Sequence, residues 1–149
     1  MARARQIPGL EPSTRFGDAA AAAVEVRAAE VFEHAAGVLD TDDIERVHDM
    51  RVATRRLRAA MEVFAPCFPP KEHRKLLAEV KRLAEALGER RDADVALQEL
   101  KGKRGVRQVV AELRAEQERG NETLAGALQR TLDEKLAERL AALAREART

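Results

Sequence analysis

Histidine and arginine residues recur along one stretch of the chain at the spacing of a helix face. His48 is followed by Arg51, Arg55 and Arg58, and intervals of three and four residues put all four side chains on one side of an α-helix. Arginine presents a planar fork of donors that matches pairs of phosphate oxygens. Together these residues, called the basic row below, predict a binding site for a phosphate-rich anion.

The other faces of this predicted helix indicate how the basic row is placed. At about 100° per residue, the row lies directly beside an apolar stripe. Val52, Ala59 and Val63 form a smaller apolar flank on its other side. We therefore expect the row to follow a groove with packed walls. The apolar stripe consists of Val47, Met50, Thr54, Leu57, Met61 and Phe64.

A second stretch of the chain adds positive charge. Between Lys71 and Arg91 there are seven basic and four acidic residues. Lys75 and Arg82 share one stripe of the helix predicted here, and Lys81 lies on the next stripe. Like charges beside a core are energetically costly unless buried acids or a ligand neutralise them. Two helices that add cations toward one groove predict a site for a multivalent anion. The alternative is a solvated face whose arginines pair with nearby acids.

Composition indicates an all-α protein. Helix-forming residues dominate, Trp and Tyr are absent, and Phe is rare. The period-2 alternation of β-branched residues that marks strands is missing. Because the predicted connections are short, we expect an antiparallel helical bundle that ends in a long C-terminal helix or helix pair.

Prolines, glycines and capping residues divide the chain. Residues 1–14 are predicted to be a flexible N-terminal arm, and residues 15–149 a single helical domain. Helices are expected over roughly residues 16–38, 42–64, 71–87 and 92–100, and from 106 almost to the end. Asp42 and Glu45 resemble a capping box. Gly88 is expected to end or kink the third helix, and Gly120-Asn121 to break or bend the last one. Its leucine stripe, predicted to be core or dimer interface, comprises Leu124, Leu128, Leu132, Leu136, Leu140 and Leu143.

Charge and cysteine content exclude several classes of protein. The net charge is only +1, so the total charge does not point to nucleic acid. Cys67 is the single cysteine, which excludes an intrachain disulfide and fits a reducing compartment, and we predict a cytoplasmic protein without a membrane segment. We expect Cys67 to be buried, and His34 and His73 to lie at the surface. No metal-ligand spacing, cofactor motif, phosphate-binding loop or activated nucleophile is present, so we expect neither a cofactor nor catalysis.

Two motifs resemble those of a known family. Residues 47–58 read VHDMRVATRRLR, and residues 87–95 read LGERRDADV. In this order they resemble the conserved histidine α-helical domain, CHAD, over about residues 16–149. The resemblance implies a helical bundle with a basic central cavity that binds inorganic polyphosphate, and association with polyphosphate granules. Carried over by position, it implies anion contacts from the basic row and Arg91, and also from Lys81 and Arg82. Lys75 completes the predicted site, which comprises His48, Arg51, Arg55, Arg58, Lys75, Lys81, Arg82 and Arg91.

The chain departs from the family's pattern in one respect. The usual domain contains two pseudo-symmetric helical halves, each with a His-x-x-Arg helix. These 149 residues contain one such helix, so the chain resembles a half-length member. We therefore predict that two copies form a two-fold homodimer that rebuilds the cavity.

Two other functions are consistent with the same residues. His48-Asp49-Met50-Arg51 also resembles the phospho-accepting His-Glu-Leu-Arg box of histidine-kinase dimerisation domains, although Val52-Ala53 replaces the usual Thr-Pro. A relay domain would form an acid-labile phosphohistidine on His48, whereas a polyphosphate binder would not. A general polyanion or nucleic-acid binder is the other alternative. Nucleic acid is not the expected partner, because aromatic residues that could stack on bases are lacking.

Overall fold

The computed structural model describes residues 3–149, and within them the chain forms five α-helices and no strand. The helices are α1 (Phe16–Glu33), α2 (Glu45–Val63), α3 (Pro70–Leu100), α4 (Arg107–Asp133) and α5 (Leu136–Ala147), and a short 3-10 helix, η1 (Ala65–Cys67), precedes α3. The all-α prediction is confirmed, and α4 and α5 form the expected C-terminal helix pair.

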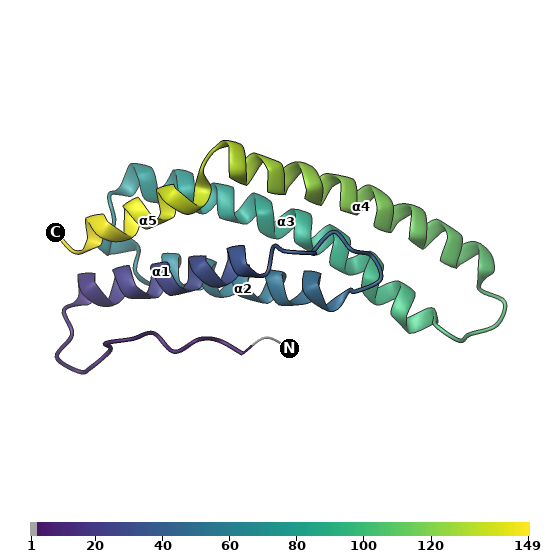
Figure 1. Ribbon diagram of the computed structural model, residues 1–149, viewed down its shortest axis with the longest axis horizontal. Helices are drawn as coiled ribbons and strands as arrows, with labels where there is room; N and C mark the ends of the chain where they lie inside the picture. The colour runs from purple at the N-terminus through teal and green to yellow at the C-terminus, as the bar shows by residue number, and fades with distance from the viewer. Residues whose placement is uncertain (1–2) are drawn as a thin grey trace.

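The helices form an elongated antiparallel bundle (Figure 1). α1 and α2 run in opposite directions, and α3 and α4 form a long hairpin that packs against them. α5 continues from α4 in the same general direction but steps toward α1, against which it packs. The loop between α3 and α4 projects beyond the end of the α1–α2 pair. The site residues therefore sit on α2 and on the part of α3 that lies inside the bundle.

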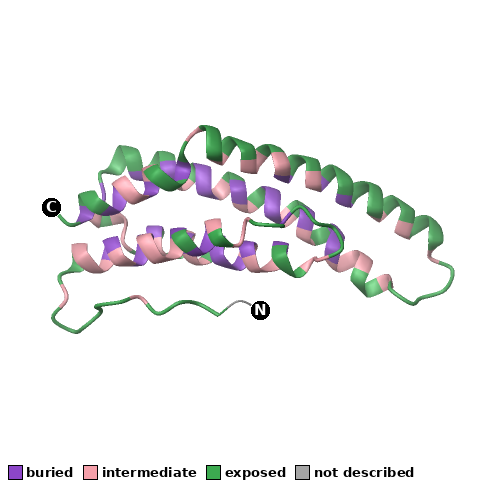
Figure 2. Cartoon of the chain, in the orientation of Figure 1, coloured by how far each residue is buried: buried purple, intermediate pink, exposed green. Residues whose placement is uncertain are grey.

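Each helix buries an apolar stripe against its neighbours (Figure 2). On α2 the predicted stripe is confirmed, since five of its members are buried and Phe64 is half-buried. One continuous cluster joins these residues to the other helices. Its larger members include Val24, Val31, Met50, Leu57, Met61, Leu76, Leu83, Leu87, Leu124, Leu136, Leu140 and Leu143.

Arg15 joins the first and the last helix at one end of the bundle (Figure 1). Its Nη2 donates to the carbonyl oxygen of Arg148 at 2.6 Å and to that of Ala147 at 3.4 Å, at the C-terminal end of α5. Arg148 in turn pairs with Glu25 of α1. These bonds occupy carbonyl groups that the last turn of a helix leaves without partners. The start of α1 is thereby held against the end of α5.

The predicted boundaries of the first two helices are wrong by several residues. α1 ends at Glu33 rather than near Gly37, because the chain already turns there and Gly37 adopts a positive φ of 73°. The capping box of Asp42 and Glu45 does not form. α2 begins at Glu45 itself and has no side-chain cap, while Asp43 pairs with Arg46 at 3.0 Å.

The predicted interruption at Gly88 is also wrong, because α3 is one helix of 31 residues. Leu83, Leu87 and Ala93 form a buried stripe that continues on both sides of Gly88. A glycine inside a helix costs about 1 kcal/mol relative to alanine. Burial of a single leucine side chain contributes about 1.5–3 kcal/mol, so packing outweighs this local cost.

The last helix breaks at a different place from the one predicted. α4 passes without interruption through Gly120, which packs so closely on α3 that a Cβ there would lie 3.3 Å from Cα of Arg90. The break follows at Glu134 and Lys135, and Lys135 has the left-handed φ of 53°. This step divides the leucine stripe. Leu124 and Leu136 are buried, whereas Leu132 is 70% exposed.

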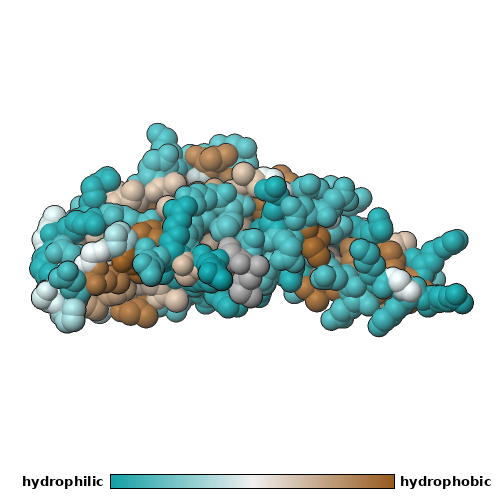
Figure 3. Space-filling model, turned by 60° about the horizontal axis from the view of Figure 1, so that its bottom comes forward, coloured by the Kyte–Doolittle hydropathy of each residue, from teal (hydrophilic) through white to brown (hydrophobic). Residues whose placement is uncertain are grey.

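The N-terminal arm lies against α1 over its described part. The backbone N–H of Arg5 donates to Glu30 at 3.1 Å, and Arg27 donates to the carbonyl oxygen of Arg5 at 3.0 Å. Figure 3 views the molecule from this side, where most of the surface is hydrophilic. Apolar surface is seen toward the end at which α1 begins and α2 ends, and Phe16 and Val63 are exposed there.

Two other residues differ from their expected placement. His73 is buried rather than at the surface. Its Nε2 lies 2.7 Å from the carbonyl oxygen of Met61, and its ring stacks on Phe68. Cys67 is only partly buried, although it packs against the core. The contact between His73 and Met61 fixes which side of α3 faces α2.

Candidate functional site

The basic row lies along the edge of the α2 core stripe. His48, Arg51 and Arg58 are half-buried, and Arg55 is exposed. The expected second wall is only partly present. Val52 is buried, but Ala59 and Val63 are exposed because no helix packs over that end of the flank. The row is therefore a partly sheltered face rather than a closed groove.

The arginines of α2 differ in whether an acid neutralises them. Arg46 pairs with Asp43, and Arg56 lies 3.8 Å from Glu30 of α1. Arg58 has only a surface pair with Glu62, at 3.3 Å. Arg51 and Arg55 make no ion pair or side-chain hydrogen bond within the described residues. The uncompensated charge of α2 is thus concentrated at the centre of the predicted site.

Two predicted site residues carry buried polar atoms that have no partner. They are Nδ1 of His48 on α2 and Nη1 of Arg91 on α3. Such atoms are uncommon in folded proteins, and leaving one unsatisfied costs about 1–3 kcal/mol. Each one calls for a physical explanation, and an anionic ligand would supply one.

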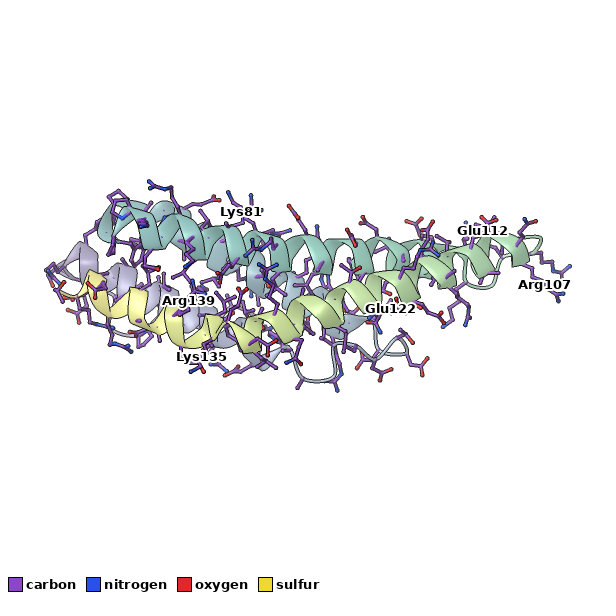
Figure 4. The ribbon with its side chains drawn as sticks, turned by 90° about the horizontal axis from the view of Figure 1, so that it is seen from above. Lys81, Arg107, Glu112, Glu122, Lys135 and Arg139 are labelled. Carbon is purple, nitrogen blue, oxygen red and sulfur yellow. The ribbon has the colours of Figure 1, made fainter. Side chains whose placement is uncertain are left out.

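The cations of α3 lie on two different flanks of the helix. Its buried stripe includes Leu76, Leu83 and Leu87, and Arg91 lies on the flank of His73, which faces α2. Lys81 falls on the outer part of the same flank by helical spacing and points away from α4 and α5 in Figure 4. The same flank carries the half-buried residues Leu77, Ala84 and Gly88.

Lys75 and Arg82 lie on the opposite flank of α3. They line a hollow together with Arg130 of α4 and Arg139 of α5, and no residue of α2 contributes to it. The sequence prediction placed both cations in the same groove as the basic row. The structure separates them from it, because α3 is covered by α2 on one side and by α4 and α5 on the other. The α2–α3 face therefore consists of the basic row with Lys81 and Arg91.

Sequence reasoning missed Arg130 and Arg139, since neither belongs to a motif and the position of α5 depends on the break at Lys135. Of the two arginines of the second motif, the sequence assigned only Arg91 to the site, and the structure places its neighbour Arg90 in the core. Arg90 is fully buried and pairs with Asp94, whereas Arg91 is half-buried on the α2 side. Arg90 and Asp94 are four residues apart, and this spacing is the sequence signal for an ion pair within one helix. Asp94 is the partner of Arg90, and neither Asp92 nor Asp94 caps a helix, because both lie inside α3.

Neither a metal site nor a membrane span is found in the part of the chain that the structure describes. No group of three or more His, Cys, Asp or Glu side chains is arranged to hold a metal ion within residues 3–149. No helix in that range has both the length and the apolar character needed to cross a bilayer.

Comparison with known proteins identifies the family. The sequence model of the CHAD domain matches residues 22–149, which include α2 to α5, most of α1 and both motifs. The chain belongs to the CHAD domain family. This family is known for polyphosphate binding, and its domain is generally a binding domain rather than a catalytic one. No curated protein and no solved structure matches this CHAD chain.

Proposed function

We propose that this CHAD domain binds inorganic polyphosphate, without catalysis, on the face formed by α2 and α3. The observation that carries the proposal is the pair of buried, unpartnered nitrogens, Nδ1 of His48 and Nη1 of Arg91, on the face that holds the uncompensated Arg51 and Arg55. An extended polyanion presents acceptor oxygens along its length, so it could pair with cations on both helices at once.

The main-chain geometry of this face agrees with a chain-like ligand. Gly88 lies on it between Lys81 and Arg91, and a Cβ added there would meet nothing within 4 Å. The space over this part of α3 is therefore open. A ligand group of about the size of a methyl group would fit against α3 at this point.

The test is loss of binding without loss of fold. Replacement of Arg51 and Arg55 together by alanine should abolish polyphosphate binding and leave the helical circular dichroism spectrum unchanged. The matched control is Arg114→Ala with Arg119→Ala, which removes two exposed arginines from α4 and should retain binding. Loss of helicity in the Arg51/Arg55 variant would mean that these arginines are structural. Equal loss of binding in the control would show that total charge, rather than this face, binds the polymer.

Competition experiments identify the ligand class. At physiological salt, unlabelled polyphosphate should displace labelled polyphosphate, whereas DNA and ATP should compete poorly. Efficient competition by DNA would instead support the general polyanion binder. Incubation with a phosphodonor should leave no acid-labile phosphate on His48, and its appearance would support the relay function.

We further propose that two copies complete the binding cavity. The described chain contains one His-x-x-Arg helix, and its basic face is open on one side. A two-fold pair would place a second basic row opposite the first, as the two halves of the usual family domain imply. Light scattering should give the mass of a dimer in the presence of long polyphosphate. A strict monomer that still binds long polyphosphate tightly would contradict this pairing.

A further inference from the structure

A second cluster of cations surrounds a hollow of about 580 Å³ on the other side of α3. Lys75, Glu79 and Arg82 come from α3, Arg130 from the last turn of α4, Glu134 from the α4–α5 connection, and Arg139 from α5. In Figure 4, Arg139 lies between α5 and α3, on the side of α3 opposite to Lys81. This cluster is therefore separate from the α2–α3 face.

The two acids of the hollow are already neutralised by arginines. Nη1 of Arg139 contacts both carboxylate oxygens of Glu79, at 3.0 and 2.9 Å. Nε of Arg130 donates to Glu134 at 3.0 Å. Lys75 and Arg82 are exposed and have no ion pair or side-chain hydrogen bond within the described residues. The hollow thus retains an excess of two positive charges.

Arg139 supplies a further sign of an unmet interaction. Its Nη2 is buried and has no hydrogen-bond partner, although Nη1 is held by Glu79 and by the carbonyl oxygen of Glu134 at 3.4 Å. Those bonds fix the guanidinium in place. A fixed guanidinium with a free donor can bind an anion with little further loss of side-chain entropy.

Acidic residues bound the cluster at both ends. The hollow that adjoins it along α3 and α4 is lined by Glu85 and Glu89. A second adjoining hollow, which shares Arg139, is lined by Glu72 and Glu146. Lys75 and Arg82 are seven residues apart, which is about 10 Å along a helix. A long polyanion that followed α3 would therefore run into repulsive carboxylates, whereas a short anion would not.

We propose that this hollow is a second anion site, which takes a short phosphate-type anion such as an oligophosphate of a few units. It is independent of polyphosphate binding at the α2–α3 face. Lys75 and Arg82 would clasp the two ends of the anion, and Arg139 would donate to its middle. α3 would then carry a long-chain site on one flank and a short-anion site on the other.

The experiment uses tripolyphosphate as the probe and calorimetry at low salt. In the background of Arg51→Ala with Arg55→Ala, one binding event per chain should remain. Adding Lys75→Ala with Arg82→Ala should weaken it at least about tenfold, since two charge-assisted contacts are lost. The matched control, Lys103→Ala with Arg104→Ala in the α3–α4 loop, removes the same residue types and should weaken it less than about twofold.

Two further measurements make the proposal specific. Tripolyphosphate should shift the side-chain ¹⁵N resonances of Arg82 and Arg139 in the chain with the intact hollow. Glu134→Gln should tighten binding, because it frees Arg130 from its acid. Absence of tripolyphosphate binding in the Arg51/Arg55 background would overturn the second site and leave the α2–α3 proposal standing. An equal effect of the loop control, or unchanged Arg82 and Arg139 resonances, would also overturn it.

Discussion

Arg90 and Asp94 form a fully buried ion pair inside α3, with Nε of Arg90 3.0 Å from Oδ1 of Asp94. Arg90 also donates to the side chain of Asn121 on α4 at 2.7 Å, and to the carbonyl oxygen of Val38 at 3.3 Å. Gln117 of α4 donates to the same oxygen of Asp94 at 2.7 Å. The pair thus ties α3 to α4 and to the α1–α2 connection. Part of the second motif therefore builds the fold, while its neighbour Arg91 faces the candidate site.

Breaking this pair should strongly destabilise the fold. Asp94→Ala would leave the charge of Arg90 buried without its carboxylate, and such changes cost about 3–5 kcal/mol. Asp92→Ala, at an exposed position two residues away, should change the free energy of unfolding by less than about 0.5 kcal/mol. Urea denaturation followed by circular dichroism measures both values. Similar small effects for the two variants would show that the pair contributes little.

Binding of long polyphosphate should depend steeply on salt and rise with chain length. Each contact between an arginine and a phosphate releases counterions, so the logarithm of affinity should fall linearly with the logarithm of salt concentration. Arg55→Ala alone should make that slope shallower by about one unit, as expected for one lost phosphate contact. Titrations at several salt concentrations measure the slope. Binding that is insensitive to salt would refute an electrostatic site.

Alanine at two helical glycines should have opposite effects on stability. Gly88→Ala should stabilise the protein by about 0.5–1 kcal/mol, since the position is helical and open. Gly17→Ala should destabilise it, because the new Cβ would overlap the carbonyl oxygen of Ala147 where α1 meets α5. Thermal unfolding of both variants tests this prediction. A stabilising effect at Gly17 would contradict the close packing of α1 on α5.

The carboxyl group of Asp18 should titrate below its usual range. Its pKa is lowered chiefly by a side-chain hydrogen bond from Arg15, whose Nη2 lies 3.2 Å from Oδ1. Because the native pKa lies below the unfolded one, this bond stabilises the fold above the unfolded pKa, and the contribution is lost as pH falls through the native pKa. ¹³C NMR titration should show the low pKa, and Arg15→Ala should return it toward normal. The control Arg145→Ala, which removes an arginine from α5, should leave the pKa of Asp18 unchanged.

The helical class, the core stripe of α2 and the residues of the basic row all follow from local sequence patterns. Each of these depends on local periodicity, because residues three and four apart share one face of a helix wherever that helix lies. The two motifs were also sufficient to indicate the CHAD family, which the comparison then showed over residues 22–149.

The ends of the helices depend on packing between helices. Gly88 and Gly120 both have low helix propensity, yet both lie inside continuous helices. The chain breaks at Lys135 instead. Packing of the long α3–α4 hairpin offsets the local cost of the two glycines. The energy that holds these helices together comes from contacts between residues far apart in the chain. Local sequence patterns therefore cannot predict it.

Packing between helices also sets which cations lie close to one another. Periodicity placed Lys75, Arg82 and Lys81 on neighbouring stripes of one helix, but it could not say which helix would cover each flank. α2 covers one flank, and α4 with α5 covers the other, so Lys75 and Arg82 are separated from the basic row and join Arg139. Sequence spacing fixes the angle of a side chain on its own helix. Which partner that side chain meets is set by the packing of the whole bundle.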